Sequence, residues 1–280
     1  MKSMTFKKTA VATVFAVSCG LVFAAPGDPP VGWNFVSAVS TPNVKIYQKG
    51  TSKVYAQVVN IGAGAKVELI QNYAGQVQST GNLQYYRGYT PMTVANWYSS
   101  QGAPVSVVNG NYFGTNTNPS SRVYFSFGMR VNGASYDSGA EINPTLINDL
   151  QLELFTGQGA YIGTRSAFRL QNGPAQNIIG GLSPAKAINP GGQVGRTGIC
   201  TLIPSSPSNL MLVMSYERAQ QSLVNSDFTA WGCTISGRIM MDGSASSQMR
   251  TVNSGVKIDG VNGSNVAGRA VPQVIVIRNN

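Results

Sequence analysis

The chain has 280 residues, no histidine and ten carboxylate side chains, and its formal net charge is +10 at pH 7. The lack of histidine excludes serine or cysteine nucleophiles that histidine activates, and metal sites that histidine ligates. The positive charge favours anionic partners such as phosphorylated glycans or wall polymers, with a purely solubilising charge as the alternative. The sequence contains no run of lysine or arginine and no nucleic-acid-binding motif, so we expect no nucleic acid partner.

Residues 1–24 are typical of a secretory signal peptide. Lys2, Lys7 and Lys8 form a basic start, and the uncharged stretch that follows offers a cleavage site at Ala24. This stretch is shorter than the ~20 residues that a membrane span needs, which disfavours the alternative of an uncleaved anchor. The sequence therefore predicts a secreted or periplasmic protein whose mature form has no membrane span.

The cysteines also indicate an exported protein. Removal of the leader takes Cys19 away and leaves Cys200 and Cys233. An even pair in an oxidising compartment predicts a disulfide between Cys200 and Cys233, with two buried thiols as the alternative. Acylation of Cys19 in a lipoprotein is disfavoured because the residues after it stay apolar.

The mature chain is predicted to contain one domain, at residues 43–280, preceded by a linker and N-terminal segment at residues 25–42. Short segments rich in valine, isoleucine, tyrosine and threonine alternate with glycine, asparagine and proline. This pattern predicts a β-rich α+β fold with a mixed sheet and few short helices. The expected strands are 43–47, 54–61, 65–71, 105–109, 123–131, 150–155, 197–203, 210–216, 237–241 and 272–277.

Two stretches carry helix signals. Residues 90–100 open with Thr90 as a cap and Pro91 at the first helical position. Residues 225–231 are typical of a short helix that ends at Gly232.

The run from Arg238 to Met249 places one carboxylate, Asp242, between an apolar segment and a turn of glycine and serines. A strand that ends in this way delivers its acid to the sheet edge, where Gly243 allows a ligand to approach closely. The alternative is that Asp242 and Gly243 form a hairpin turn, because Asp-Gly is a frequent turn dipeptide.

A second stretch, residues 104–114, is an apolar strand that ends at Asn109 and Gly110. The Asn109 amide can donate to a phosphate or sugar oxygen, and Tyr112 and Phe113 offer flat walls for a sugar ring. The alternative is a hairpin, since Asn-Gly is a leading hairpin turn signal.

A third stretch places Arg196 between glycines at the start of a strand. Its planar guanidinium suits bidentate binding of a phosphate, and a salt bridge to one of the few acids is the alternative.

Taken in this order, these stretches resemble the motifs of the phosphodiester glycosidase family. The resemblance covers residues from about Asn43 to the C-terminus, and its motifs are NGNYF at 109–113, RTGIC at 196–200, WGC at 231–233, MDGSASSQM at 241–249 and RAVPQVIVI at 269–277. It implies an exported hydrolase that cleaves the anomeric bond of glycosyl-1-phosphodiesters in surface or wall glycans.

By motif match, the resemblance implies that Asn109, Arg196 and Asp242 are the catalytic residues. The expected substrate-binding residues beside them are Gly110, Asn111, Tyr112, Gly243, Ser244, Ser246 and Ser247. A phosphate is already a good leaving group, so a site without histidine is chemically reasonable. Such a site still needs a carboxylate as nucleophile, water base or oxocarbenium stabiliser, and donors for the phosphate.

A second carboxylate is expected for a two-acid mechanism. Asp137 and Glu141 are the candidates for this role and for substrate binding, although both also fit solvated loop acids. We predict no cofactor and no metal; the alternative is a divalent cation that Asp242 holds together with Asp137 or Glu141.

Two positions depart from the family pattern, since Asn111 and Ser244 replace glycines. This motivates a rival hypothesis, in which the protein is a non-catalytic carbohydrate-binding or wall-binding envelope protein on the same fold. A third hypothesis, a structural envelope protein, predicts no pocket that joins Asn109, Arg196 and Asp242. The sequence does not indicate an oligomeric state.

Overall fold

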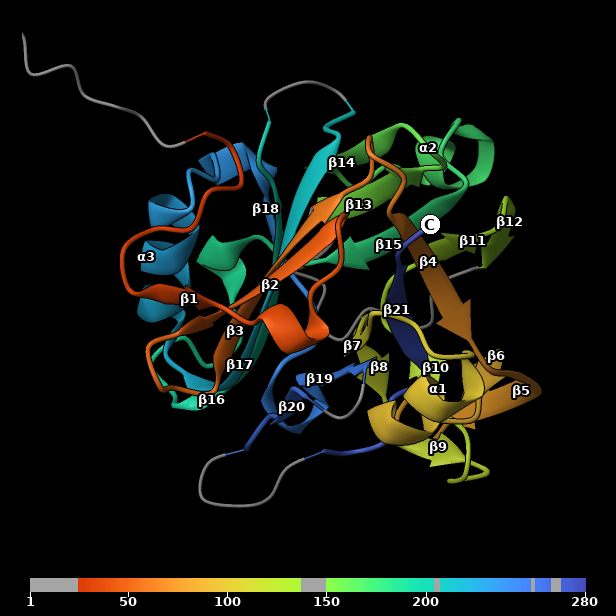
Figure 1. The fold of residues 1–280 in the computed structure, drawn as a ribbon. Helices are drawn as coiled ribbons and strands as arrows, with labels where there is room; N and C mark the ends of the chain where they lie inside the picture. The colour runs from red at the N-terminus through yellow and green to blue at the C-terminus, as the bar shows by residue number, and fades with distance from the viewer. Residues whose placement is uncertain (1–24, 137–149, 204–206, 253–254, 263–267) are drawn as a thin grey trace, which may run out of the picture.

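Antiparallel sheets dominate the computed structural model, which describes residues 25–136, 150–203, 207–252, 255–262 and 268–280 (Figure 1). The predicted signal peptide, Asp137 and Glu141 lie outside the described residues. A six-stranded sheet has the order β1 (Trp33–Phe35), β2 (Val44–Lys49), β3 (Val54–Asn60), β17 (Leu210–Ala219), β16 (Val194–Thr201) and β18 (Arg238–Met240).

Two five-stranded sheets pack beside it. One has the order β20 (Lys257–Asp259), β19 (Gln248–Thr251), β7 (Ser106–Asn109), β21 (Gln273–Arg278) and β4 (Lys66–Gln71). The other has the order β12 (Ala134–Tyr136), β11 (Met129–Val131), β15 (Asn177–Gly181), β13 (Leu150–Phe155) and β14 (Gly159–Thr164). Smaller sheets contain β6 (Tyr85–Tyr89), β5 (Tyr73–Ser79) and β9 (Thr117–Asn118), and β10 (Tyr124–Phe125) with β8 (Phe113–Gly114).

The β-rich α+β fold predicted from the sequence is confirmed, and each predicted strand overlaps an observed one. The stretch 123–131 is divided between β10 and β11. The prediction of a mixed sheet is wrong, because the pairings between the named strands of the described chain are all antiparallel. Parallel pairs need long crossovers, usually through a helix, and the helices here are short. Within the predicted N-terminal segment, β1 pairs with β2 at a sheet edge.

The helices are α1 (Val94–Ser100), α2 (Ala167–Asn172) and α3 (Gln221–Ala230). The cap of α1 is Thr93, whose hydroxyl accepts from the Asn96 N–H at 3.2 Å, so the prediction of Thr90 as the cap is wrong. The reason is that the Thr90 N–H donates to the Asn72 carbonyl at 3.0 Å, which ties this part of the chain to a neighbouring segment before the helix begins. Helix α3 begins before the predicted residue 225. None of the helices in the described ranges has the length and apolar character needed to cross a membrane.

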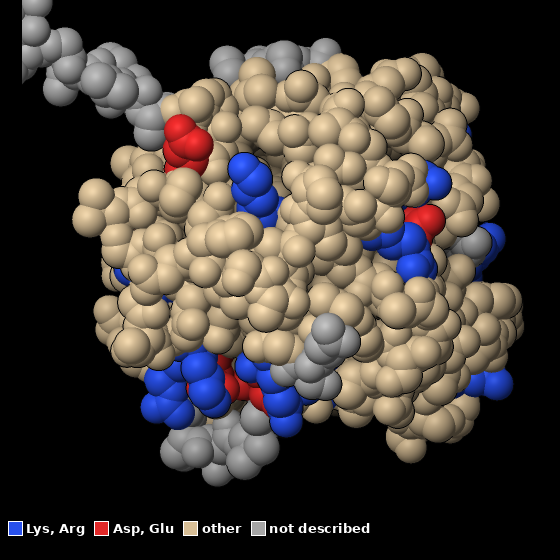
Figure 2. Space-filling model, viewed as in Figure 1, with Lys and Arg blue, Asp and Glu red and all other residues tan. Residues whose placement is uncertain are grey.

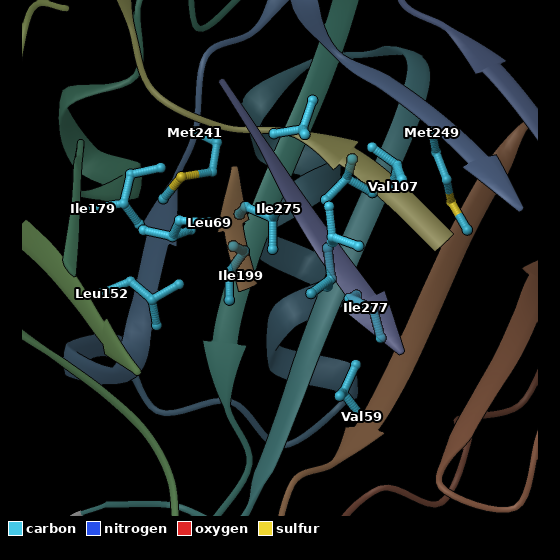
Figure 3. Close-up of a cluster of buried hydrophobic side chains, with 14 of the residues drawn as sticks. Val59, Leu69, Val107, Leu152, Ile179, Ile199, Met241, Met249, Ile275 and Ile277 are labelled. Atoms are coloured by element: carbon cyan, nitrogen blue, oxygen red, sulfur yellow. The ribbon is translucent and has the colours of Figure 1, made fainter. Parts of the chain in front are cut away.

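The main core lies where the three larger sheets meet. Figure 3 shows Val59 and Ile199 of the six-stranded sheet together with Val107 and Ile275 of one five-stranded sheet and Leu152 of the other. All five side chains are buried, and each contributes roughly 1.5–3 kcal/mol relative to an exposed side chain. The core therefore fixes the relative positions of the three sheets.

Strand β3 is covered on both faces. Val59 belongs to the main core, whereas Val58 on the opposite face packs in a second cluster that includes Trp231 and Cys233. The six-stranded sheet is therefore a central layer, with the main core on one face and helix α3 near the other (Figure 1).

Charged side chains are sparse on the face shown in Figure 2, and one group of blue side chains surrounds a smaller red area at the lower edge. Ion pairs such as Lys53 with Glu217, at 2.7 Å, and Lys257 with Asp259, at 3.2 Å, account for part of the surface charge.

The predicted disulfide between Cys200 and Cys233 is confirmed. It joins β16 to the segment that follows α3, with 6.1 Å between the two Cα atoms. Both cysteines are buried in the cluster that contains Trp231. The bond therefore attaches α3 to the central sheet.

We expect the Cys200→Ala/Cys233→Ala variant to lose about 2–4 kcal/mol of unfolding free energy, because the bond closes a 33-residue separation that the unfolded chain would otherwise leave open. Urea unfolding of the variant and of the wild type, with and without reductant, measures the difference. Reduced wild type should match the variant. An unchanged unfolding midpoint in both would contradict a stabilising role.

Candidate functional site

Asp242 lies just beyond β18, where the chain passes from the six-stranded sheet to β19 in a five-stranded sheet. Because β18 and β19 belong to different sheets, the hairpin interpretation of Asp242 and Gly243 is wrong. Met241 is buried in the main core, and the Asp242 N–H donates to the Gly110 carbonyl at 3.1 Å. These contacts hold the Asp242 side chain at a cavity of about 170 Å³.

Asp242 is buried, with 8% of its surface exposed, and both oxygens of its carboxylate accept hydrogen bonds. Oδ1 accepts from the Gly243 N–H at 3.0 Å, and Oδ2 accepts from Arg269 Nη2 at 2.9 Å. Burial raises the pKa of Asp242, and it outweighs the opposing effects of Arg269, Ser246 and the Gly243 N–H. The carboxylate is therefore costly to ionise, although it has a positive partner.

Asn109 lies behind the cavity and does not line it. Its Nδ2 donates to the Asp242 carbonyl at 2.7 Å, and its Oδ1 accepts from Thr197 Oγ1 at 2.7 Å and from the Gln248 N–H at 3.0 Å. Strand β7 pairs with β19 and β21, so Asn109 does not open a hairpin and that interpretation is wrong. The amide positions the backbone that carries Asp242.

Arg196 lines the same cavity as Asp242, but its donors point at backbone oxygens. Nη1 donates to the Ile188 carbonyl at 2.9 Å, Nη2 to the carbonyls of Asn189 and Gly192, and Nε to the Ala219 carbonyl at 3.4 Å. Burial lowers the pKa of Arg196. Among the described residues, the hydrogen-bond partners of Arg196 are backbone carbonyls. The structure therefore does not show the salt bridge to an acid that was the alternative role for Arg196. Arg196 thereby stabilises the loop at residues 188–192, which borders the cavity.

Gly110 and Gly243 allow close packing around Asp242. A Cβ atom at Gly110 would lie 1.8 Å from Gln273 Oε1, and one at Gly243 would lie 3.1 Å from the Gly195 carbonyl oxygen. A side chain at Gly110 would therefore displace the Gln273 amide, which accepts from the Asn111 N–H at 2.8 Å.

The positions that depart from the family pattern have different surroundings. Tyr112, a predicted substrate-binding residue that follows the family pattern, lines the cavity and contacts Phe127 edge to face. Of the two positions that depart from that pattern, Ser244 lines the cavity and has a φ of 56°, in the left-handed region that favours glycine. Asn111 is buried outside the cavity, and its Nδ2 donates to the Phe127 carbonyl at 2.9 Å. Of the two replacements, Ser244 is therefore the one that lines the cavity.

Ser246 and Ser247 are buried and do not line the cavity. Ser246 Oγ accepts from Arg269 Nε, and Ser247 Oγ lies 2.7 Å from Thr197 Oγ1. The Ser246 hydroxyl therefore contacts Arg269, which lines the cavity, and the Ser247 hydroxyl contacts Thr197, which does not.

The structure thus brings Asp242, Arg196, Tyr112, Gly243 and Ser244 to one cavity. It places the other predicted residues of the described chain in the layer behind them. The structural-protein hypothesis predicted no pocket joining Asn109, Arg196 and Asp242; the last two share the cavity and Asn109 lies behind it. Among the described residues, no three acidic or cysteine side chains are grouped to hold a metal ion.

Arg269 is the main residue at the cavity that was not predicted as part of the site. It pairs with Asp242, and its guanidinium lies 4.4 Å from the centre of the Phe113 ring. The sequence signal that could have identified Arg269 as a site residue is its position at the start of the RAVPQVIVI motif. Thr197 and Gln248 were also missed, because both act through the Asn109 amide.

No protein-family model matches the chain, and no curated protein matches it. Among solved structures, it is similar to the zebrafish N-acetylglucosamine-1-phosphodiester alpha-N-acetylglucosaminidase catalytic domain auto-inhibited by its pro-peptide, at 12% identity and a TM-score of 0.48, over 82% of this chain and 90% of that chain. A protein from Synechocystis is similar at 10% identity and a TM-score of 0.45, over 89% of this chain and 61% of that chain. A protein from Burkholderia pseudomallei is similar at 9% identity and a TM-score of 0.45, over 84% of this chain and 74% of that chain.

Proposed function

We propose that the protein is an exported hydrolase that cleaves the anomeric bond of glycosyl-1-phosphodiesters in surface or wall glycans. The observation that carries the proposal is Asp242, a buried carboxylate that lines a cavity together with Arg269, the cation that pairs with it. A carboxylate beside cationic donors is the combination that departure of a phosphate from a sugar requires. The motif resemblance of the chain supports the same reaction.

In the proposed reaction, ionised Asp242 attacks the anomeric carbon or accepts a proton from the attacking water. The bond between the anomeric carbon and the phosphate oxygen breaks, and the oxygen keeps the electron pair. Water supplies the new hydroxyl of the free sugar, and the phosphate leaves as a monoester. Because this leaving group is already stable as an anion, the reaction uses no cofactor and needs little acid assistance.

The size of the cavity bears on the substrate. Its volume of about 170 Å³ is below the roughly 300–1,000 Å³ of typical small-molecule sites, so it would hold one group of a larger molecule. We therefore propose that a single sugar unit or its phosphate enters and that the rest of the glycan stays outside. The signal-peptide prediction for residues 1–24 supports a substrate at the cell surface.

A non-catalytic carbohydrate-binding protein is the second candidate. It is favoured by the left-handed backbone of Ser244 at the cavity and by the engagement of the Asp242 carboxylate with Arg269. Binding of a phosphoglycan without release of sugar would support this candidate.

We expect Asp242→Asn to reduce release of reducing sugar from sugar-1-phosphodiesters by about 100-fold or more, because the amide can neither attack nor accept a proton. Glu217→Gln removes a partly exposed acid and should leave turnover unchanged. Circular dichroism should show the same fold for both variants. Equal turnover by wild type and Asp242→Asn would contradict the proposed role of Asp242.

The activity should fall at acid pH as Asp242 takes up a proton. Burial raises the pKa of Asp242 above 3.8, so the acidic limb of kcat/KM should lie above that value. The carboxylate is active when ionised, and activity is therefore retained above its pKa and lost below it. A kcat/KM profile on one phosphodiester, with protein stability recorded at each pH, measures the limb. A limb at or below 3.8 in a stable protein would exclude Asp242 as the titrating group.

Ser244→Gly should raise the unfolding free energy by up to about 1 kcal/mol, because glycine adopts a positive φ without steric cost. Ser99→Gly in helix α1 is the matched control and should lower it by about 0.5–1 kcal/mol. Urea unfolding at one pH compares the two variants. If Ser244→Gly is less stable than wild type, its hydroxyl contributes more than the backbone strain costs. Assayed on the same phosphodiesters, Ser244→Gly also shows whether Ser244 limits turnover.

A further inference from the structure

The pair between Arg269 and Asp242 joins an accessible cation to a buried anion. The Arg269 side chain is 42% exposed, whereas the Asp242 side chain is 11% exposed. Because the Arg269 side chain is partly exposed, water and dissolved anions can reach the guanidinium and compete for its donors. A bound anion can therefore compete with Asp242 for Arg269.

Arg269 also has more unused donors than Arg196. A guanidinium has five N–H donors. Those of Arg196 are directed at four backbone carbonyls, which hold it in place. For Arg269, Nε donates to Ser246 and Nη2 to Asp242, and no acceptor for Nη1 is found among the described residues. Of the two cations at the cavity, Arg269 therefore has more N–H groups left to bind a ligand.

The surroundings of Arg269 support a short movement. Its guanidinium lies over the ring of Phe113, at 4.4 Å from the ring centre, and this attraction extends to about 6 Å, which leaves room for a small displacement. Asp242 does not lose all its partners when Arg269 moves, because the Gly243 N–H stays bound to Oδ1. The carboxylate would remain in position.

We propose that Arg269 exchanges Asp242 for the phosphate of the substrate, so that the site selects anionic phosphodiesters over neutral glycosides of the same sugar. This inference rests on the proposed function. In the free protein, Arg269 neutralises the carboxylate. When a phosphodiester enters, Nη1 and Nη2 bind its oxygens as a fork, and the carboxylate becomes available to the anomeric carbon. A neutral glycoside offers no anion, so Arg269 stays paired with Asp242 and the carboxylate cannot reach the anomeric carbon.

The test compares Arg269→Gln, Arg269→Lys and a matched control, Lys53→Gln, which removes an exposed cation that pairs with Glu217. Inorganic phosphate and methyl phosphate are titrated calorimetrically into each protein. We expect Arg269→Gln to lose at least about 10-fold in affinity for both anions, which is about 1.4 kcal/mol, and Lys53→Gln to lose none. Arg269→Lys keeps the positive charge but loses the two parallel donors of the guanidinium. Its affinity for both anions should lie between those of the wild type and Arg269→Gln.

Kinetics on a sugar-1-phosphodiester and on a neutral aryl glycoside of the same sugar give the second measurement. Arg269→Gln should lower the ratio of the two kcat/KM values by at least 10-fold, in line with the lost affinity. Its acidic limb should move to higher pH, because Arg269 lowers the pKa of Asp242 in the wild type. A merely structural role would reduce both substrates equally and leave the limb in place.

The two proposals fail in different ways. If wild type hydrolyses neither substrate but binds phosphate through Arg269, the proposed function fails and anion binding by Arg269 stands without a catalytic purpose. If Arg269→Gln keeps the wild-type phosphate affinity and substrate ratio, the exchange is overturned while hydrolysis stands. Absence of phosphate binding to the wild type overturns the exchange as well.

Discussion

The structure around the cavity depends on one buried amide, that of Asn109. Its oxygen binds Thr197 of the six-stranded sheet and the Gln248 backbone of a five-stranded sheet, and its nitrogen binds the Asp242 carbonyl. One side chain thus joins two sheets at the point where the chain crosses between them. An unsatisfied buried amide costs about 1–3 kcal/mol, so the arrangement is most stable when all these partners are in place. The position of Asp242 follows from this constraint.

Electrostatics at the cavity reflect a balance between burial and pairing. Burial favours the neutral form of Asp242, and the neighbouring guanidinium favours the ionised form. Arg196 contributes to this balance only indirectly, since its donors serve backbone carbonyls. The two arginines therefore have separate tasks, one in the wall of the cavity and one at its opening.

The sequence predicted the large strands well, because runs such as 210–216 and 272–277 are apolar enough to be buried whichever sheet they join. It missed several strands, among them β5, β6, β14, β15 and β19, and the glycines in β5, β6, β14 and β15 weaken the strand signal. It misplaced the start of α1 because tertiary pairing holds Thr90. For the site, the motifs located Asp242 and Arg196. They could not show that Asn109 faces the protein, or that Arg269 pairs with an acid 27 positions away, since such pairings depend on how sheets pack.

The hydrogen bonds of Arg196 have a consequence for how such a cavity could diversify. They hold the loop from Ile188 to Gly192 by its main chain, which is the same whatever side chains the loop carries. A substitution at Ile188, which lines the cavity, could therefore change the shape and polarity of the rim without loosening the loop. Asn189, with a φ of 51°, and Gly192, where a Cβ atom would lie 2.2 Å from the Asn189 side chain, are more restricted. The arginine thus fixes the rim of the cavity without using any side chain of the loop.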